Sequence, residues 1–169
     1  MKRPVPCLLP GLLLAGAACA QPTEGEALRN WFDDPFLALS RDQAGCPEPA
    51  GPRVSEAERR TQAHRRAEKG TTCWLAGEPD CAQSSAYRYD AGIADAIRAD
   101  ATLGATLAGS SVWITVQGRV VYAEGCVRDA AQAEALERQL RALPHVQQVI
   151  PLLRLQAGQR PPYRVFPGR

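Results

Sequence analysis

The stretch VWITVQGRVVYAEGCVRD, residues 112–129, decides the fold of this chain. Apolar residues alternate along its start, so that Val112, Ile114 and Val116 fall on one face of a strand. Gln and Gly then form a tight turn, and RVVYAEGCV follows as a second run rich in β-branched residues. The stretch therefore predicts an antiparallel hairpin, with Cys126 near the end of its second strand.

Helices and a third strand flank this hairpin in the sequence. Residues 87–107 carry apolar residues at helical spacing, which predicts an amphipathic helix with a break near Asp100. Residues 130–143 carry a similar apolar stripe that is ended by Pro144, which predicts a second helix. VQQVIPLLRL, residues 146–155, predicts a third strand.

Residues 1–20, MKRPVPCLLPGLLLAGAACA, have the layout of a secretory signal peptide. A basic start with Lys2 and Arg3 precedes a short apolar run, and small residues stand before the expected cleavage after Ala20. A second interpretation stays open, in which Cys19 is the lipidated N-terminus of an anchored lipoprotein. Both interpretations predict an exported chain, and the first predicts a periplasmic one.

Charge and hydropathy exclude some partners. The formal net charge is +2, and removal of residues 1–20 takes away Lys2 and Arg3 but no acidic residue, so the mature chain is neutral. A neutral chain has no broad electrostatic field that attracts nucleic acid. The apolar run of residues 8–18 is too short and too broken to span a bilayer, and no later segment is more apolar, so no transmembrane segment is predicted.

Residues 21–86 are interpreted as a cysteine-bearing N-terminal extension. Its first part is interrupted by prolines and glycines, which predicts irregular structure. One helix is expected over about residues 55–69, because Ser55 and Glu58 have the spacing of a capping box and Gly70 follows as an end signal.

Four cysteines remain after residues 1–20: Cys46, Cys73, Cys81 and Cys126. An even number in an exported protein favours two disulfides, which can pair in three ways. Cys73 and Cys81 flank a Gly-Glu-Pro-Asp turn and are close enough in sequence to pair locally. Zinc is disfavoured, because no Cys-x-x-Cys occurs and the chain has only two histidines.

The order of helix, strand, strand, helix and strand resembles the BON domain, a small module of bacterial envelope proteins. The residues that carry the resemblance are Val116, Gly118, Val120, Gly125, Val127, Val146 and Val149. The resemblance implies an α+β fold over residues 87–156, with a three-stranded mixed sheet and two helices on one face. It also implies structural turn roles for Gly118 and Gly125.

Two positions depart from the family pattern. One residue more than usual separates Gly118 from Gly125, which predicts a bulge in the second strand. His145 stands just before Val146, where a glycine is common in the family.

Within the BON-like sheet, Cys126 can be assigned to a face. If Val127 points to the helices, Cys126 points to the opposite, outer face. That face also gains Trp113, Thr115, Ile150 and Leu152. It is too apolar to stay in water, so the extension is expected to cover it, with Cys126 bonded to Cys46 and Cys73 bonded to Cys81.

No catalytic residue, metal ligand or cofactor is predicted. His64 and His145 have no nucleophile beside them in a recognisable motif, so both are interpreted as solvated histidines. Asp33 and Asp34 could hold a cation, but a turn between buried aromatics explains them more simply.

The function therefore rests on the family resemblance, which implies binding of phospholipid or of an envelope protein. Anionic lipid is expected to contact the surface around Arg128, Arg138 and Arg141. The alternative is a structural domain closed by its own extension, whose Pro/Arg-rich tail at residues 157–169 is extended and docks a partner.

Overall fold

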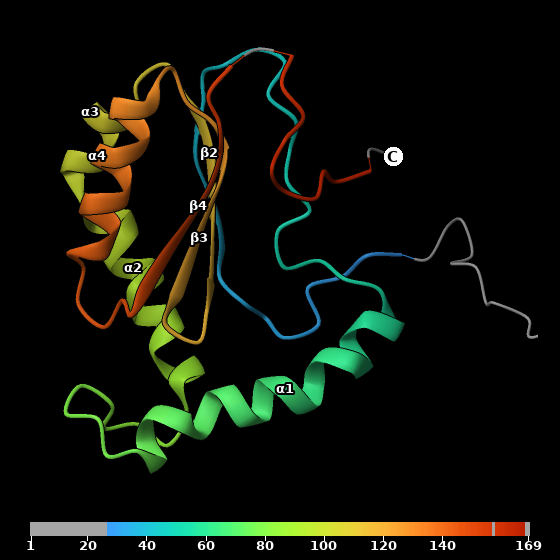
Figure 1. Ribbon diagram of the computed structural model, residues 1–169, viewed down its shortest axis with the longest axis vertical. Coiled ribbons are helices and arrows are strands. Elements are labelled where there is room, and N and C mark those ends of the chain that lie inside the picture. Colours follow the sequence, from blue (N-terminus) through green and yellow to red (C-terminus); the bar gives the residue numbers. More distant parts are fainter. Residues whose placement is uncertain (1–26, 157, 168–169) are drawn as a thin grey trace, which may run out of the picture.

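A four-stranded mixed sheet forms the centre of the computed structural model, which describes residues 27–156 and 158–167 (Figure 1). The strand order is β1-β2-β3-β4; β2 is antiparallel to both β1 and β3, and β4 is parallel to β3. The strands are β1 Phe36–Arg41, β2 Ser111–Gln117, β3 Val120–Cys126 and β4 Gln148–Arg154. The expected α+β fold with a mixed sheet is confirmed.

The sheet has one strand more than the three predicted, because β1 comes from the N-terminal extension. Ala38 pairs with Trp113 of β2, and the register shifts between Ala38 and Ser40. Leu37 is buried in the core and Leu39 packs against it. The prediction of irregular structure is therefore wrong for residues 36–41. This short segment is a strand because it pairs with β2, which lies at least 70 residues further along the chain, so no local sequence pattern marks it.

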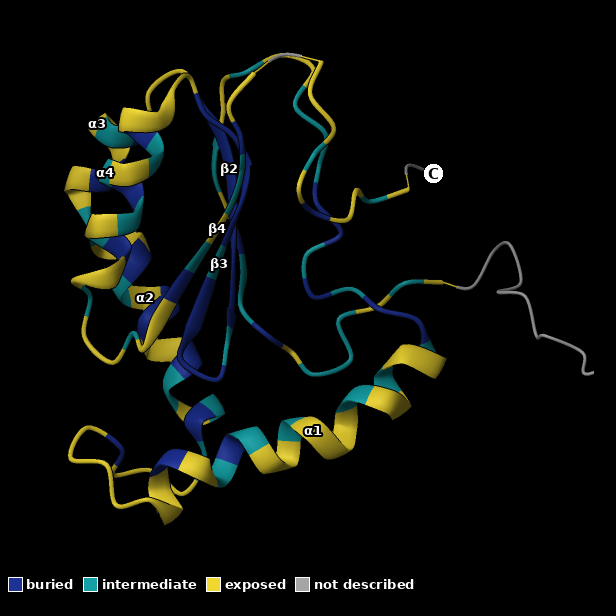
Figure 2. Ribbon diagram, viewed as in Figure 1, coloured by how far each residue is buried: buried dark blue, intermediate teal, exposed yellow. Residues whose placement is uncertain are grey.

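Three helices cover one face of the sheet: α2 Asp90–Ala99, α3 Ala101–Leu107 and α4 Ala130–Arg141 (Figure 1). A 3₁₀ helix, η1 Ala86–Tyr89, leads into α2. The predicted break falls at Asp100, whose backbone is extended and whose carboxylate accepts a hydrogen bond from the Thr102 N–H to cap α3. The buried layer in Figure 2 is built from apolar side chains of helices and strands, among them Ile93, Ile97, Leu103, Leu136, Leu140, Val112, Ile114, Val116 and Val121.

Helix α1, Glu56–Leu75, lies outside this layer and crosses the hairpin end of the sheet (Figure 1). Its predicted capping box is present: the Ser55 hydroxyl accepts from the Glu58 N–H at 3.2 Å, and the Glu58 carboxylate accepts from the Ser55 N–H at 2.8 Å. The predicted end at Gly70 is wrong, because the helix continues to its own disulfide. A Cβ at Gly70 would lie 3.2 Å from the Tyr87 ring, so the glycine gives close packing rather than a stop.

The hairpin of β2 and β3 turns on Gly118 and Arg119, with φ values of 58° and 67° that fit a two-residue type I′ turn. Asp90 fixes this turn by accepting the Gly118 and Arg119 N–H groups at 2.6 and 2.8 Å. The two strands pair at every position from Ser111 with Cys126 to Gln117 with Val120, so this ladder contains no bulge and that prediction is wrong. Gly125, predicted as a turn residue, lies within β3.

Residues 42–55 and the C-terminal tail run along the side of the sheet opposite the helices (Figure 1). Pro49 and Val165 form an antiparallel bridge, and the Phe166 N–H donates to the Glu48 carbonyl at 2.8 Å. The described part of the tail is therefore docked on its own chain. Docking of this tail on a partner stays a prediction.

Candidate functional site

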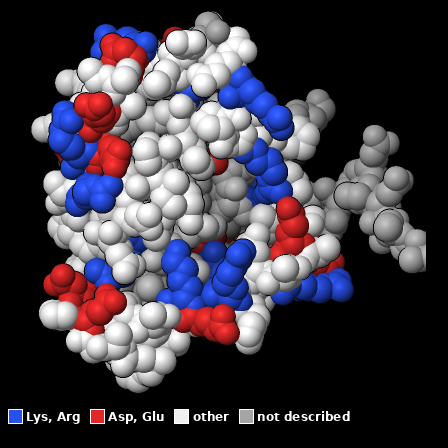
Figure 3. Space-filling view, viewed as in Figure 1, with Lys and Arg blue, Asp and Glu red and all other residues white. Residues whose placement is uncertain are grey.

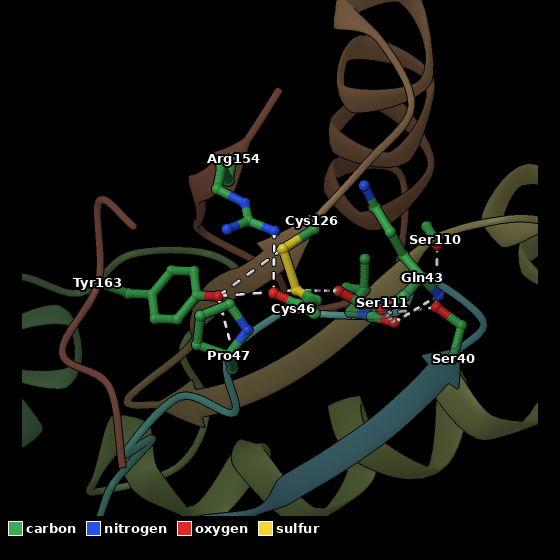
Figure 4. The surroundings of a disulfide bond; sticks show 11 residues. Ser40, Gln43, Cys46, Pro47, Ser110, Ser111, Cys126, Arg154 and Tyr163 are labelled. Atoms are coloured by element: carbon green, nitrogen blue, oxygen red, sulfur yellow. Dashed lines mark hydrogen bonds between the residues drawn. A yellow bond between two sulfur atoms is a disulfide. The ribbon is translucent and has the colours of Figure 1, made fainter. Parts of the chain in front are cut away.

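The sulfur of Cys126 lies on the outer face of the sheet, away from the helices, and forms a disulfide with Cys46 at an S–S distance of 2.04 Å (Figure 4). The Tyr163 hydroxyl donates to the Pro47 carbonyl at 2.8 Å, and its oxygen lies 4.0 Å from the Cys126 sulfur. The second expected disulfide, Cys73–Cys81, is also present. Both pairings predicted with the family resemblance are confirmed.

Other polar groups accompany Cys126 on the outer face. Trp113 and Thr115 are only 4% and 3% exposed, and neither the Trp113 Nε1 nor the Thr115 hydroxyl has a hydrogen-bond partner among the described residues. Glu124, which pairs with Trp113 across the strands, is also buried. Burial raises the pKa of Glu124 to about 7, against a smaller opposing effect of Arg164.

A cavity of about 460 Å³ opens between α1 and the outer face, and we call it the α1 cleft. One face of α1 lines it, because its five lining residues recur at helical spacing: Glu58, Gln62, Arg65, Arg66 and Lys69. Gln117 and Tyr122 contribute from the sheet, and Arg164 contributes from the tail. Figure 3 shows basic side chains gathered above α1 at this hollow.

An ion pair holds α1 against the sheet at the cleft. The Arg66 guanidinium donates to both oxygens of the buried Asp34 carboxylate, at 2.5 and 3.1 Å, and the Gln117 amide donates to the same carboxylate at 2.7 Å. The Arg66 guanidinium also lies 4.1 Å from the centre of the Phe32 ring and 4.2 Å from that of Tyr87. Asp34 is therefore the anchor of α1.

The Asp34 carboxylate is occupied by Arg66 and Gln117. Within residues 27–156 and 158–167, no group of three or more histidine, cysteine, aspartate or glutamate residues is placed to hold a metal ion. The sequence did not signal the anchor role of Asp34, since Arg66 lies 32 residues further along the chain.

The remaining charges of the α1 cleft differ in how they are paired. Arg164 donates to both Glu58 oxygens, at 2.9 and 3.2 Å, and also to the Arg53 carbonyl. The Lys69 ammonium donates to the Gln117 carbonyl at 3.2 Å, and burial lowers the pKa of Lys69 although Asp90 opposes that shift. Arg65 is exposed and has no ionic or hydrogen-bonding partner among the described residues.

Tyrosine rings form the rest of the polar wall. Burial raises the pKa of both Tyr87 and Tyr122, so both hydroxyls stay protonated and can donate hydrogen bonds at neutral pH. No hydrogen bond joins the Tyr122 hydroxyl to the described part of the chain. The α1 cleft thus combines cations, neutral donors and aromatic surface.

The residues expected to contact lipid lie elsewhere, on and before α4. Arg138 and Arg141 are exposed but paired within the helix, Arg138 with Glu134 at 3.8 Å and Arg141 with Glu137. α4 as a whole therefore carries no net charge. Arg128 precedes the helix, and its aliphatic stem packs beside Gly109. Two of the three arginines are therefore paired with glutamates of the same helix.

The two histidines have structural surroundings. His64 is exposed on α1, with its Nε2 3.2 Å from the Glu68 carboxylate. His145 has a φ of 65°, in the left-handed region that glycine favours, and its ring centre lies 4.9 Å from that of Tyr89. This conformation explains why a glycine was expected there.

Comparison with known proteins gives one match. Residues 89–157 match the family model described as the BON domain, which confirms the resemblance over the unit from α2 to β4. Neither the curated proteins nor the solved structures that were searched gave a match. Among the helices of the described residues, none has the length and apolar character needed to cross a membrane.

Proposed function

Because residues 89–157 form a BON domain, we propose that this chain is an exported, non-enzymatic binding module of the bacterial envelope. The family match carries the proposal, since BON domains are generally non-enzymatic and suggest an envelope or phospholipid-binding role. Two disulfides fit an oxidising compartment outside the cytoplasm. The signal-peptide pattern of residues 1–20, including Cys19, lies outside the described residues, and periplasmic export stays part of the proposal.

The proposed ligand is anionic phospholipid, contacted at the α4 side through Arg128, Arg138 and Arg141. Glu134 and Glu137 neutralise the helix, so contact there depends on arginine donors that exchange their glutamate partners for lipid phosphates. An envelope protein that presents carboxylates is the other partner compatible with these side chains.

Vesicle flotation tests the proposal. The protein should float with vesicles of phosphatidylcholine and phosphatidylglycerol, and not with phosphatidylcholine alone. Arg138→Gln combined with Arg141→Gln should weaken this binding about tenfold or more, because each basic residue near an anionic surface contributes about 1 kcal/mol. The matched control, Arg60→Gln with Arg98→Gln, removes two exposed and paired arginines of α1 and α2.

Two results contradict lipid binding at α4. If the protein fails to float with anionic vesicles at any ionic strength, phospholipid is not its ligand. If the double variant and its control lose vesicle binding equally, the α4 surface is not the lipid-binding site. The envelope-protein alternative then remains, to be tested by crosslinking in intact cells.

A second candidate is a structural domain whose outer sheet face is closed by the chain's own extension. Support comes from the Cys46–Cys126 bond together with the burial of Trp113. Replacing both Cys46 and Cys126 by serine should increase amide exchange in β2 and in residues 42–55 while leaving α4 protected. Unchanged exchange in β2 would contradict a closing role for the extension.

A further inference from the structure

The α1 cleft has more positive charge than its own acidic residues compensate. Four cations line it, Arg65, Arg66, Lys69 and Arg164. Glu58 binds Arg164 and the buried Asp34 binds Arg66, so Arg65 and Lys69 have no acidic partner among the residues that line the cleft. Asp90, outside the lining, acts on Lys69 and raises its pKa against the effect of burial. Arg65 and Lys69 are four positions apart on the same face of α1. A dianion or a pair of anions complements these two cations.

Hydrogen-bond donors are unused at the same place. The Arg65 guanidinium has five N–H groups and no partner in the described chain. Lys69 donates one of its three N–H groups to the Gln117 carbonyl, which leaves two. The Tyr122 hydroxyl, on the opposite wall, is also unpartnered among the described residues. A tetrahedral oxyanion accepts several such bonds at once.

A buried hydroxyl, that of Thr115, neighbours in the sheet a residue that lines the cleft, although Thr115 itself does not line it. Thr115 faces the same side of the sheet as Gln117 and stands opposite Tyr122 in the register. It is 3% exposed, and its oxygen has no partner among the described residues. Buried hydroxyls are normally paired, so a bound molecule or water is expected next to it.

The volume of the cleft exceeds what one anion needs. At about 460 Å³ it falls in the range of small-molecule sites. Pro52, Val54 and the Tyr87 and Tyr122 rings supply apolar wall beside the charges. The Arg66–Asp34 ion pair and the capping box fix α1, so the walls are formed before a ligand arrives.

We propose that the α1 cleft binds the phosphate group of a phosphomonoester, with Arg65 and Lys69 as its charge partners and the tyrosine rings against its organic part. The dianionic charge and several acceptor oxygens of a phosphomonoester match these two cations and the unused donors. The group can belong to a free small molecule or to a lipid headgroup. This site is separate from the α4 surface, and either can exist without the other.

Calorimetric titration of the full chain with inorganic phosphate and with glycerol phosphate tests the cleft. One ligand per chain is expected, with tighter binding of the ester. Arg65→Gln should weaken both affinities at least tenfold, and Arg65 is exposed, so the variant should fold. Arg60→Gln, an exposed arginine of the same helix outside the cleft, should change them less than twofold. Acetate should bind much more weakly than phosphate.

Vesicles separate the two sources of the phosphate group. Binding to phosphatidic acid vesicles that is lost in Arg65→Gln and kept in Arg138→Gln/Arg141→Gln indicates a lipid headgroup. Phosphate binding without vesicle binding through Arg65 indicates a free ester. The proposal is overturned if phosphate produces no saturable signal, if acetate binds equally well, or if Arg60→Gln has the effect of Arg65→Gln. Vesicle binding that depends only on α4 then still supports the proposed function.

Discussion

Gly125 occupies a position in β3 that no side chain can share. Its φ is 140°, and a Cβ there would lie 2.1 Å from the Ser111 carbonyl oxygen. Gly125→Ala should therefore lower the free energy of unfolding by about 3 kcal/mol or more, because both backbone conformation and space oppose it. Urea unfolding measures the change.

The matched control for this substitution is Gly92→Ala in α2. A Cβ at Gly92 meets no atom within 4 Å, and alanine favours the helix by up to about 1 kcal/mol. A Gly125→Ala protein as stable as the Gly92→Ala protein would show that the β2–β3 ladder relaxes around a side chain.

Glu124 gives the fold a pH dependence that can be measured. Burial raises its pKa from 4.5 to about 7 in the folded chain. Between these values the unfolded chain ionises while the folded chain stays protonated, so stability falls as pH rises from about 4.5 to about 7 and then levels off. Glu124→Gln should thus stabilise the protein by roughly 2 to 3 kcal/mol at about pH 8 and hardly at all at about pH 4.

Unfolding of the Glu124→Gln protein across this pH range tests the prediction. Glu134→Gln on the exposed surface of α4 is the control and should shift stability by less than about 0.5 kcal/mol at either end. A Glu124→Gln effect that is independent of pH would mean that the carboxyl has the same pKa in the folded and the unfolded chain.

At the scale of elements, the Asp34–Arg66 ion pair is the most deeply buried of the ion pairs that fix the position of α1. Arg66→Gln leaves the Asp34 carboxylate buried without its cation, which should cost about 3 kcal/mol of stability and speed amide exchange along α1. Its neighbour Arg65 is exposed, and Arg65→Gln should change stability by less than about 0.5 kcal/mol. Equal exchange rates in the two variants would show that packing alone holds the helix.

The two disulfides should contribute unequally to stability. Cys46–Cys126 joins residues 80 apart and Cys73–Cys81 joins residues 8 apart. Chain entropy then assigns about 4.5 kcal/mol to the first bond and about 2.5 kcal/mol to the second. Thermal unfolding of the two double serine variants should rank them in that order, and the reverse order would indicate that the unfolded chain keeps structure around Cys46.

At the scale of the whole molecule, the BON domain and the extension share one sheet. Without residues 27–55 the core loses Leu37, and Trp113 loses its β1 neighbour Ala38. A fragment of residues 86–156 is therefore expected to be poorly folded, with little chemical-shift dispersion of the amide signals in NMR spectra. A well-dispersed spectrum would show that residues 86–156 fold alone, and would support the domain boundary near residue 86 that the sequence suggested.

Local signals in the sequence predicted the parts of the fold that depend on neighbouring residues. The capping box of Ser55, the hairpin turn at Gly118 and the break at Asp100 each involve groups within a few positions of one another. The strand β1 and the Asp34–Arg66 pair depend on contacts between distant segments, so no local pattern marks them. The end of α1 was wrongly predicted at Gly70, because in a sequence a glycine needed for close packing looks the same as a glycine that ends a helix.

The candidate site was less predictable than the fold. The sequence of α1 mixes charges of both signs, as ordinary solvated helices do. Nothing in the sequence therefore marked Arg65 and Lys69 as candidate binding residues. They became distinctive only when Glu58 and Asp34 were found to be occupied by Arg164 and Arg66. Alternation along the strands did predict the face on which Cys126 lies, because that property follows from neighbouring residues alone.

The pairing of the cysteines has a consequence for biosynthesis. Cys73–Cys81 is nested inside the loop closed by Cys46–Cys126. Cys73 and Cys81 are 8 positions apart and can pair almost as soon as both emerge, whereas the partner of Cys46 follows 80 positions later. In an exported chain delivered N-terminus first, we expect Cys46 to wait longest for its partner. A disulfide isomerase is then needed only where Cys46 bonds Cys73 or Cys81 before Cys126 arrives.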